Sequence, residues 1–154
     1  MSQGKRKLPI AGNIYPKYTS KNLVVKYLMK RFFRDLDRLL CSLRVKKVLD
    51  VGCGEGYITQ HIANSLKDVY IEGCDLQEDI ITLASQLNPG LKFSVQSCYK
   101  LSYKDNGFDL IVACELLEHL EDPLKAIEEI KRVSSNFCLF SVPQEPLWRI
   151  LNLL

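Results

Sequence analysis

The spacing of hydrophobic residues changes along the chain, and the first region has the period of a helix. Apolar side chains recur every three or four residues after Ser20, at Leu28, Phe32, Leu36, Leu39 or Leu40, and Leu43. This spacing predicts an amphipathic helix of about six turns with Ser20 as its N-cap. Because Asp35 and Asp37 interrupt its basic side, we expect the apolar stripe to dock on the rest of the domain rather than in a membrane.

Beyond this helix, short apolar runs alternate with amphipathic segments. Strands are predicted at residues 48–51, 69–75, 91–95, 108–114 and 137–142, and helices at 57–66, at 78–87 and from Pro123, which follows the N-cap Asp122. In the last helix Leu124, Ile127, Ile130 and Val133 are expected to face inward. Alternating β and α units with short connections predict an α/β fold with a doubly wound, mostly parallel sheet and right-handed crossovers.

The first of these strands runs into a glycine-rich turn, Val-Leu-Asp-Val-Gly-Cys-Gly-Glu-Gly-Tyr over residues 48–57. Glycine tolerates positive φ angles and lets a backbone approach a ligand closely, so a cofactor site is predicted here. A dinucleotide fingerprint would need a small residue where Tyr57 stands, which disfavours NAD and FAD. A phosphate-binding P-loop would need a lysine at the end of the turn, and none occurs before Lys67.

The motif resembles that of the class I S-adenosylmethionine-dependent methyltransferases, in particular the type 11 group, whose hallmark is Asp/Glu-x-Gly-x-Gly-x-Gly after the first strand. Asp50, Gly52, Gly54 and Gly56 match it. The resemblance extends over residues 45–147 and implies a Rossmann-like sheet of order 3-2-1-4-5. Family members usually add two more strands, which this chain lacks. We therefore expect a basic arm at residues 1–19 and a single, C-terminally incomplete methyltransferase domain at residues 20–154.

Candidate cofactor residues lie where the predicted strands end, since ligands of such sheets bind beyond the carboxyl ends of the strands. Asp75, 19 residues after Gly56, is placed to accept hydrogen bonds from ribose hydroxyls, and Leu76 to contact an adenine. The alternative role for Asp75 is to cap the next helix. The complete predicted set comprises Asp50, Gly52, Cys53, Gly54, Gly56, Asp75, Leu76, Ser97, Cys98, Cys114 and Glu115.

This sequence departs from the family pattern at Ser97, where the family usually has an aspartate that contacts the adenine amino group. A serine hydroxyl can accept that hydrogen bond without a charge, and the Cys98 backbone can assist. The implied cofactor is S-adenosylmethionine, with S-adenosylhomocysteine as the product. No catalytic residue is assigned: His119 belongs to a Glu-His-Leu run that is frequent in the family and is interpreted as structural, although a histidine could serve as a general base.

Composition limits the remaining possibilities. A chain of 154 residues with 47% hydrophobic content is long enough for one packed domain. The basic, polar N-terminus lacks the apolar segment of a secretory signal, and no run of 18 apolar residues occurs, which favours a cytoplasmic protein without a transmembrane segment. Six scattered cysteines form no metal-binding pattern, so no metal is expected and most should be small buried hydrophobes.

Charge is distributed unevenly. Residues 1–47 carry 13 Lys and Arg against 2 Asp and Glu, whereas residues 48–154 carry 8 against 16. The basic part could attract an anionic substrate, a nucleic acid or a membrane surface; the favoured interpretation is a solvated helix face that pairs with the acidic body. Nucleic acid is disfavoured as a partner because few aromatic residues interleave the charges.

The predicted function is methyl transfer to a small-molecule or lipid-linked acceptor. Two alternatives stay open: a catalytically silent methyltransferase-like binding module, and a methyltransferase acting on RNA or protein. An exposed fifth strand would be an aggregation liability, which a homodimer or the C-terminal segment could cover. Tyr15 and Tyr18 of the arm are candidate lid residues over the cofactor.

Overall fold

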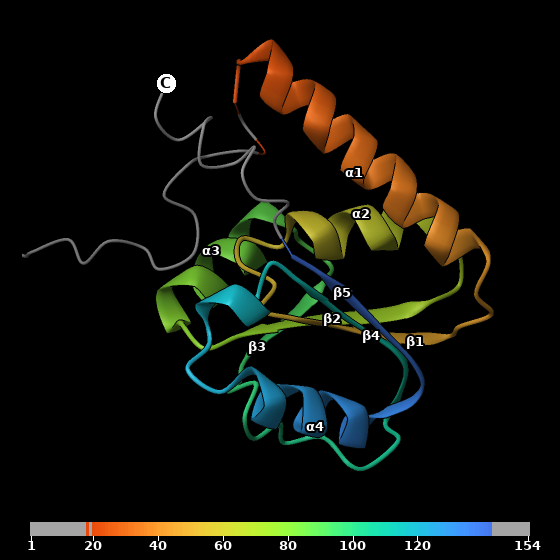
Figure 1. Cartoon of the computed structure of the whole chain (residues 1–154), viewed down its shortest axis with the longest axis vertical. Coiled ribbons are helices and arrows are strands. Elements are labelled where there is room, and N and C mark those ends of the chain that lie inside the picture. Colours follow the sequence, from red (N-terminus) through yellow and green to blue (C-terminus); the bar gives the residue numbers. More distant parts are fainter. Residues whose placement is uncertain (1–17, 19, 143–154) are drawn as a thin grey trace, which may run out of the picture.

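The computed structural model describes residue 18 and residues 20–142, and in them a five-stranded parallel sheet lies between two layers of helices (Figure 1). The strands are β1 (Lys47–Val51), β2 (Tyr70–Asp75), β3 (Lys92–Val95), β4 (Phe108–Cys114) and β5 (Ser134–Ser141). The helices are α1 (Leu23–Cys41), α2 (Tyr57–Ser65), α3 (Glu78–Leu87) and α4 (Pro123–Val133), with a 3-10 turn η1 (Leu117–His119). The strand order β3-β2-β1-β4-β5, all parallel, confirms the predicted fold class.

One face of the sheet is covered by α1, α2 and α3 (Figure 1). The stripe of α1 reaches the core through Leu36 and Leu40, which pack with Ile58 and Ile62 of α2, as expected from its period. The start of α1 differs from the prediction. Asn22 is the N-cap, because its side-chain oxygen accepts from the backbone N–H of Val24 at 2.9 Å.

The other face is covered by α4, whose Ile130 and Val133 pack against Phe108 and Ile111. Its N-cap Asp122 accepts from the backbone N–H of Lys125 at 3.1 Å, as predicted. The expected inward position of Leu124 is wrong: this side chain is 73% exposed. Ala126, Ile130 and Val133 form the inward face, and Leu124 lies about 200° round the helix from Ala126.

Strand β5 begins at Ser134, three residues before the predicted start, and follows α4 without a loop. Among the described residues it pairs only with β4, so it forms an edge of the sheet there. The predicted N-terminal arm, apart from Tyr18, and the segment after residue 142 lie outside the described residues. No helix of the described part is both long and apolar enough to cross a membrane.

Candidate functional site

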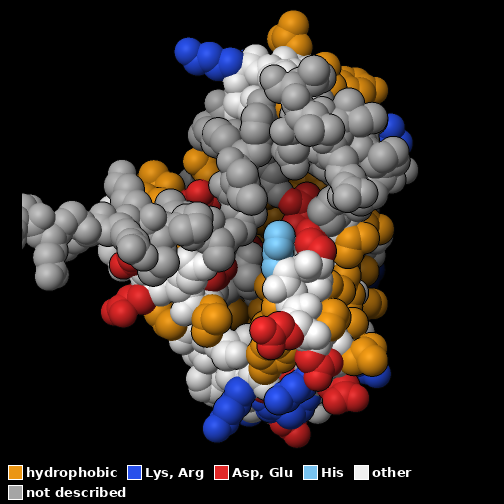
Figure 2. All heavy atoms as spheres, turned by 60° about the vertical axis from the view of Figure 1, so that its left-hand side comes forward, with side chains coloured by type: hydrophobic (Ala, Val, Ile, Leu, Met, Phe, Trp, Pro, Cys, Tyr) orange, Lys and Arg blue, Asp and Glu red, His pale blue; other side chains and the backbone are white. Residues whose placement is uncertain are grey.

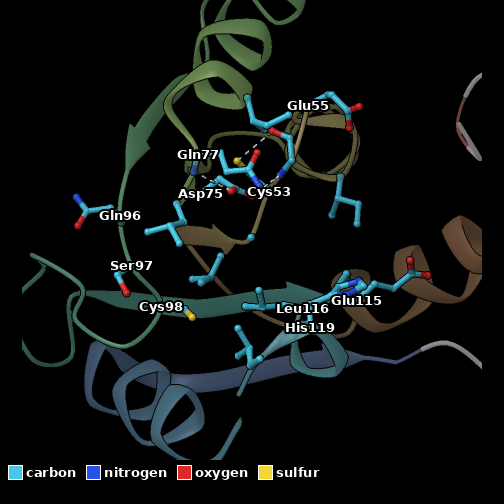
Figure 3. A pocket seen from close by; sticks show the side chains of 18 of the residues that line it. Cys53, Glu55, Asp75, Gln77, Gln96, Ser97, Cys98, Glu115, Leu116 and His119 are labelled. Atoms are coloured by element: carbon cyan, nitrogen blue, oxygen red, sulfur yellow. Dashed lines mark hydrogen bonds between the residues drawn. The ribbon is translucent and has the colours of Figure 1, made fainter. Parts of the chain in front are cut away.

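The carboxyl ends of the parallel strands open into a cavity of about 400 Å³ (Figure 3). Its walls come from the turn after β1, the end of β2, the loop after β3 and the segment after β4. Strand order reverses between β1 and β4, since crossovers lead from β1 towards β3 on one side and from β4 to β5 on the other. Ligands of doubly wound sheets bind at such a switch point.

The glycine turn forms one wall, and its backbone needs glycine. Gly52, Gly54 and Gly56 have φ angles of +74°, +53° and +83°, a region that costs other residues strain. A Cβ at Gly52 would also lie 2.9 Å from Cδ1 of Leu116, a lining residue that follows β4. Gly52, Cys53 and Gly54 line the cavity, so the backbone itself is available to a ligand.

Gly56 lies behind this wall, where it starts α2. It packs against Asn88, a buried polar residue after α3. The Asn88 Nδ2 donates to the carbonyls of Glu55 at 3.0 Å and Ala84 at 2.9 Å. Asn88 therefore ties the glycine turn to the end of α3 and holds it in place.

Asp75 lines the cavity at the end of β2 and forms hydrogen bonds to two neighbouring backbone segments. One carboxylate oxygen accepts from the backbone N–H of Gly54 at 3.1 Å, and the other from that of Gln77, the N-cap residue of α3, at 3.2 Å. Leu76 beside it is 68% exposed and also lines the cavity. The carboxylate thus fixes the glycine turn while it borders the space next to it.

Asp50 does not line the cavity and is buried beneath the glycine turn. Its carboxylate accepts from the hydroxyl of Thr59 on α2 at 2.6 Å. Burial raises the pKa of Asp50 to about 7, against the effect of the Thr59 hydrogen bond, and the nearby charge of Asp75 raises it further. Asp50 therefore joins β1 to α2 and lies outside the lining of the cavity.

The wall opposite the glycine turn comes from two segments (Figure 3). The loop after β3 contributes Ser97 and Cys98, and the end of β4 contributes Cys114 and Glu115. Glu115 has a positive φ of 53°, and its N–H donates to the Ser141 carbonyl at 2.8 Å. Strained backbone held by neighbouring structure is a common feature of ligand sites.

Two tyrosines, Tyr18 and Tyr57, line the cavity and contact each other. The Tyr18 ring stacks on that of Tyr57, with centroids 4.7 Å apart and planes at 21°, and it packs against Phe33 of α1. Burial, followed by the charge of Asp50, raises the pKa of Tyr18, so its hydroxyl keeps its proton. Tyr18 is thus at the cavity, while Tyr15 lies outside the described residues.

The two histidines have different surroundings. His119 lies in η1 on the cavity wall. His61 instead contacts Asp37 of α1 at 2.8 Å through its Nε2, with Ser65 donating to the same carboxylate oxygen at 2.8 Å. These hydrogen bonds lower the pKa of Asp37 against a burial effect. The His61 group joins α1 to α2 and has no place in the cavity.

The charge of the lining is one-sided. Glu55, Asp75 and Glu115 contribute carboxylates, and no lysine or arginine is found among the described lining residues. Acidic side chains flank the hollow in Figure 2. Such a lining favours ligands with a positive charge over anionic ones. Within the described residues no cluster of His, Cys, Asp and Glu could hold a metal ion.

Nine of the eleven predicted site residues therefore meet at one cavity, and Asp50 and Gly56 lie behind it. Sequence reasoning did not assign ten further lining residues to the site: Val51, Glu55, Tyr57, Ile58, Gln77, Ile80, Gln96, Tyr99, Leu116 and Leu120. Most of them lie within a few residues of a predicted strand end, which was the available signal; only the fold shows which of these side chains turn towards the cavity.

A family model described as "Methyltransferase domain" matches residues 49–136. A norajmaline N-methyltransferase of Rauvolfia serpentina is 34% identical over 61% of this chain and 34% of its own length. A demethylmenaquinone methyltransferase of Paenarthrobacter aurescens is 29% identical over 90% of this chain and 56% of its own. A ubiquinone biosynthesis O-methyltransferase of Coxiella burnetii is 30% identical over 77% and 47%, so the chain spans between about a third and just over half of these relatives.

A solved structure of a Pyrococcus horikoshii protein has a TM-score of 0.67 and 26% identity, and the match covers 82% of this chain and 63% of that one. The plantazolicin methyltransferase BpumL, solved with a pentazolic desmethylPZN analogue and S-adenosylhomocysteine, has the same TM-score at 20% identity, covering 87% of this chain and 53% of that one. At that identity, the second likeness concerns the fold alone.

Proposed function

The chain belongs to the family of class I S-adenosylmethionine-dependent methyltransferases, and from this premise we propose that it binds S-adenosylmethionine and transfers its methyl group to a small-molecule or lipid-linked acceptor. The observation that carries the proposal is the cavity that has the glycine turn as one wall, with the Asp75 carboxylate bordering the cavity and stabilising the turn. Family membership follows from the match over residues 49–136.

The described lining fits this cofactor in size and charge. A volume of about 400 Å³ lies in the range of small-molecule sites, and three carboxylates without a lining lysine or arginine suit a ligand that carries a sulfonium and an ammonium group. When bound, the cofactor supplies a methyl group already activated by its sulfonium. The protein has only to hold and align the reactants and to exclude water.

We assign cofactor binding to the residues that line the cavity on both sides. Asp75 would accept hydrogen bonds from ribose hydroxyls, and exposed Leu76 would cover an adenine. The backbone of Gly52, Cys53 and Gly54 would contact the amino acid part, while Ser97 and Cys98 would border the base. Asp50 and Gly56 would contribute indirectly, by holding β1, the turn and α2 together.

The acceptor would lie beyond the end of β4, where Tyr18, Tyr57, Glu115 and His119 surround the rest of the cavity. An acceptor without a negative charge suits this wall, because none of its described side chains is a lysine or arginine. Methyltransferases named for small molecules among the relatives support this class of acceptor. His119 would be required as a base only for an acceptor that must lose a proton.

The test is a calorimetric titration of the chain with S-adenosylhomocysteine. We expect one site, weakened at least about tenfold in Asp75→Ala, since the mutation removes a carboxylate acceptor. Asp79→Ala, a change of an exposed aspartate in the first turn of α3, is the matched control and should bind like the parent. Equal affinities for all three proteins would contradict the assigned site, and no binding to any of them would contradict the function.

A further inference from the structure

The side of α1 that faces away from the domain carries apolar and basic residues together. Its first turns expose Leu23 to 80%, Tyr27 to 65% and Val24 to 52%. Along the same side, at helical spacing, follow the exposed residues Lys30, Arg31, Arg34 and Arg38. We call these seven residues the outer face of α1. Figure 1 shows α1 lying over α2, with its first turns extending past the sheet.

Within the described residues, the domain packs against the other side of α1. The buried side of α1, with Val25, Met29, Leu36 and Leu40, supplies its contact with the core. A solvated helix would be expected to present polar residues opposite that side. Three exposed apolar side chains in the first two turns of a helix leave hydrophobic area in water, and such patches mark interaction surfaces. In Figure 2, hydrophobic and basic side chains occur together at the top of the molecule, where α1 begins.

The sequence suggested that the basic residues of this face pair with the acidic body of the domain, and among the described residues they do not. In the described residues, Arg31, Arg34 and Arg38 make their ion pairs with Asp35 of the same helix, at 3.8, 3.3 and 3.6 Å. One carboxylate thus serves three guanidinium groups, and all four side chains are about half exposed or more. Exposed pairs of this kind contribute little, and the face keeps a clear excess of positive charge.

We propose that the outer face of α1 binds an anionic lipid surface, with Leu23, Val24 and Tyr27 entering the headgroup boundary and the basic residues contacting lipid phosphates. A helix with this combination can bind in the interface without crossing the membrane. Each lysine or arginine near an anionic bilayer adds attraction that falls off with salt. A nucleic acid would use the charges but would leave the exposed leucine and valine without a role, so the lipid surface accounts for more of the face.

The experiment is co-sedimentation of the chain with vesicles of phosphatidylcholine alone and with about 30% phosphatidylglycerol. We expect binding to the anionic vesicles only, weakened at about 0.5 M salt compared with about 0.1 M. The double variant Leu23→Ser, Tyr27→Ser should lose at least about tenfold in partitioning. Leu124→Ser is its matched control, because Leu124 is 73% exposed on the opposite layer, in α4.

A second pair of variants tests the charge. Lys30→Glu should weaken binding to anionic vesicles about tenfold, and Lys131→Glu, at an exposed position of α4, should leave it unchanged. The proposal is overturned if neutral and anionic vesicles bind equally, or if the variants of α1 and of α4 behave alike. It is also overturned if a single-stranded oligonucleotide binds where vesicles do not, or if the Leu23→Ser, Tyr27→Ser change only converts a dimer into a monomer in sedimentation.

Discussion

Asp50→Asn should remove a pH dependence of stability that the buried carboxyl imposes on the native protein. The pKa of Asp50 rises from an ordinary 3.8 to about 7, chiefly through burial. Between these two values the folded chain keeps a proton that the unfolded chain has released. The free energy of unfolding therefore falls as the pH rises from about 4 to about 7 and then levels off.

The size of the effect follows from the pKa difference. At about 1.4 kcal/mol per pH unit, the charged carboxylate costs roughly 4 kcal/mol above pH 7, of which about 3 kcal/mol is lost between pH 5 and pH 7. Asparagine resembles the protonated carboxyl and can still accept from the Thr59 hydroxyl, which lies 2.6 Å from the Asp50 oxygen. The variant should thus match the parent only near pH 4 and exceed its stability by roughly 4 kcal/mol at pH 8, so that its advantage grows by about 3 kcal/mol between pH 5 and pH 8.

The assay is urea denaturation followed by circular dichroism, at intervals from about pH 5 to about pH 8. Other titrating groups cancel, because the quantity of interest is the difference between parent and variant at each pH. Asp79→Asn provides a control at an exposed aspartate and should follow the parent. Parallel curves for the parent and Asp50→Asn would show that Asp50 is charged throughout, and the account of its burial would be wrong.

Three further changes test the supports of the site. Gly56→Ala should lower the free energy of unfolding by about 3 kcal/mol in a urea titration, because φ is +83° and the new Cβ would lie 2.8 Å from the ring of Phe93. Gly90→Ala is the control: φ is +96° but the surrounding space is open, so the cost should be only about 1 kcal/mol. Asn88→Ala should cost about 2 kcal/mol and weaken S-adenosylhomocysteine binding in calorimetry, because the Glu55 carbonyl loses the side-chain donor that ties the glycine turn to α3. The hydrogen bonds from Arg132 lower the pKa of Glu129, so this carboxylate stabilises the parent above about pH 4.5 and the stabilisation is lost in acid. Glu129→Gln should therefore flatten the dependence of the melting temperature on pH between about pH 3 and about pH 7, and an unchanged dependence would contradict this.

Several features could be predicted because they depend on residues adjacent in sequence. The alternation of apolar strands and amphipathic helices indicated the doubly wound sheet, and the order β3-β2-β1-β4-β5 came from the family resemblance. The glycine spacing located the turn, and Asp75 followed from its distance to that turn. The first residue of α1 was harder to predict, because both Ser20 and Asn22 can cap a helix and only the backbone geometry selects Asn22.

Other features depended on contacts between distant segments. Asp50 and Asp75 both follow apolar strand residues, yet one is buried against Thr59 of α2 and the other borders the cavity. Strand periodicity determines which face a side chain takes, but the burial of that face depends on the helix that packs there. The bracing of the glycine turn by Asn88, 33 residues away from Glu55, likewise appears only in the folded chain.

Sequence alone thus determined the elements, the fold class and the turn that makes a ligand site, since periodicity, glycine and capping preferences act over a few residues. The tertiary structure decided which side chains share the cavity, which carboxyl is forced towards its neutral form and which side of α1 remains in solvent. These outcomes depend on packing and desolvation, which arise when segments far apart in the chain come together.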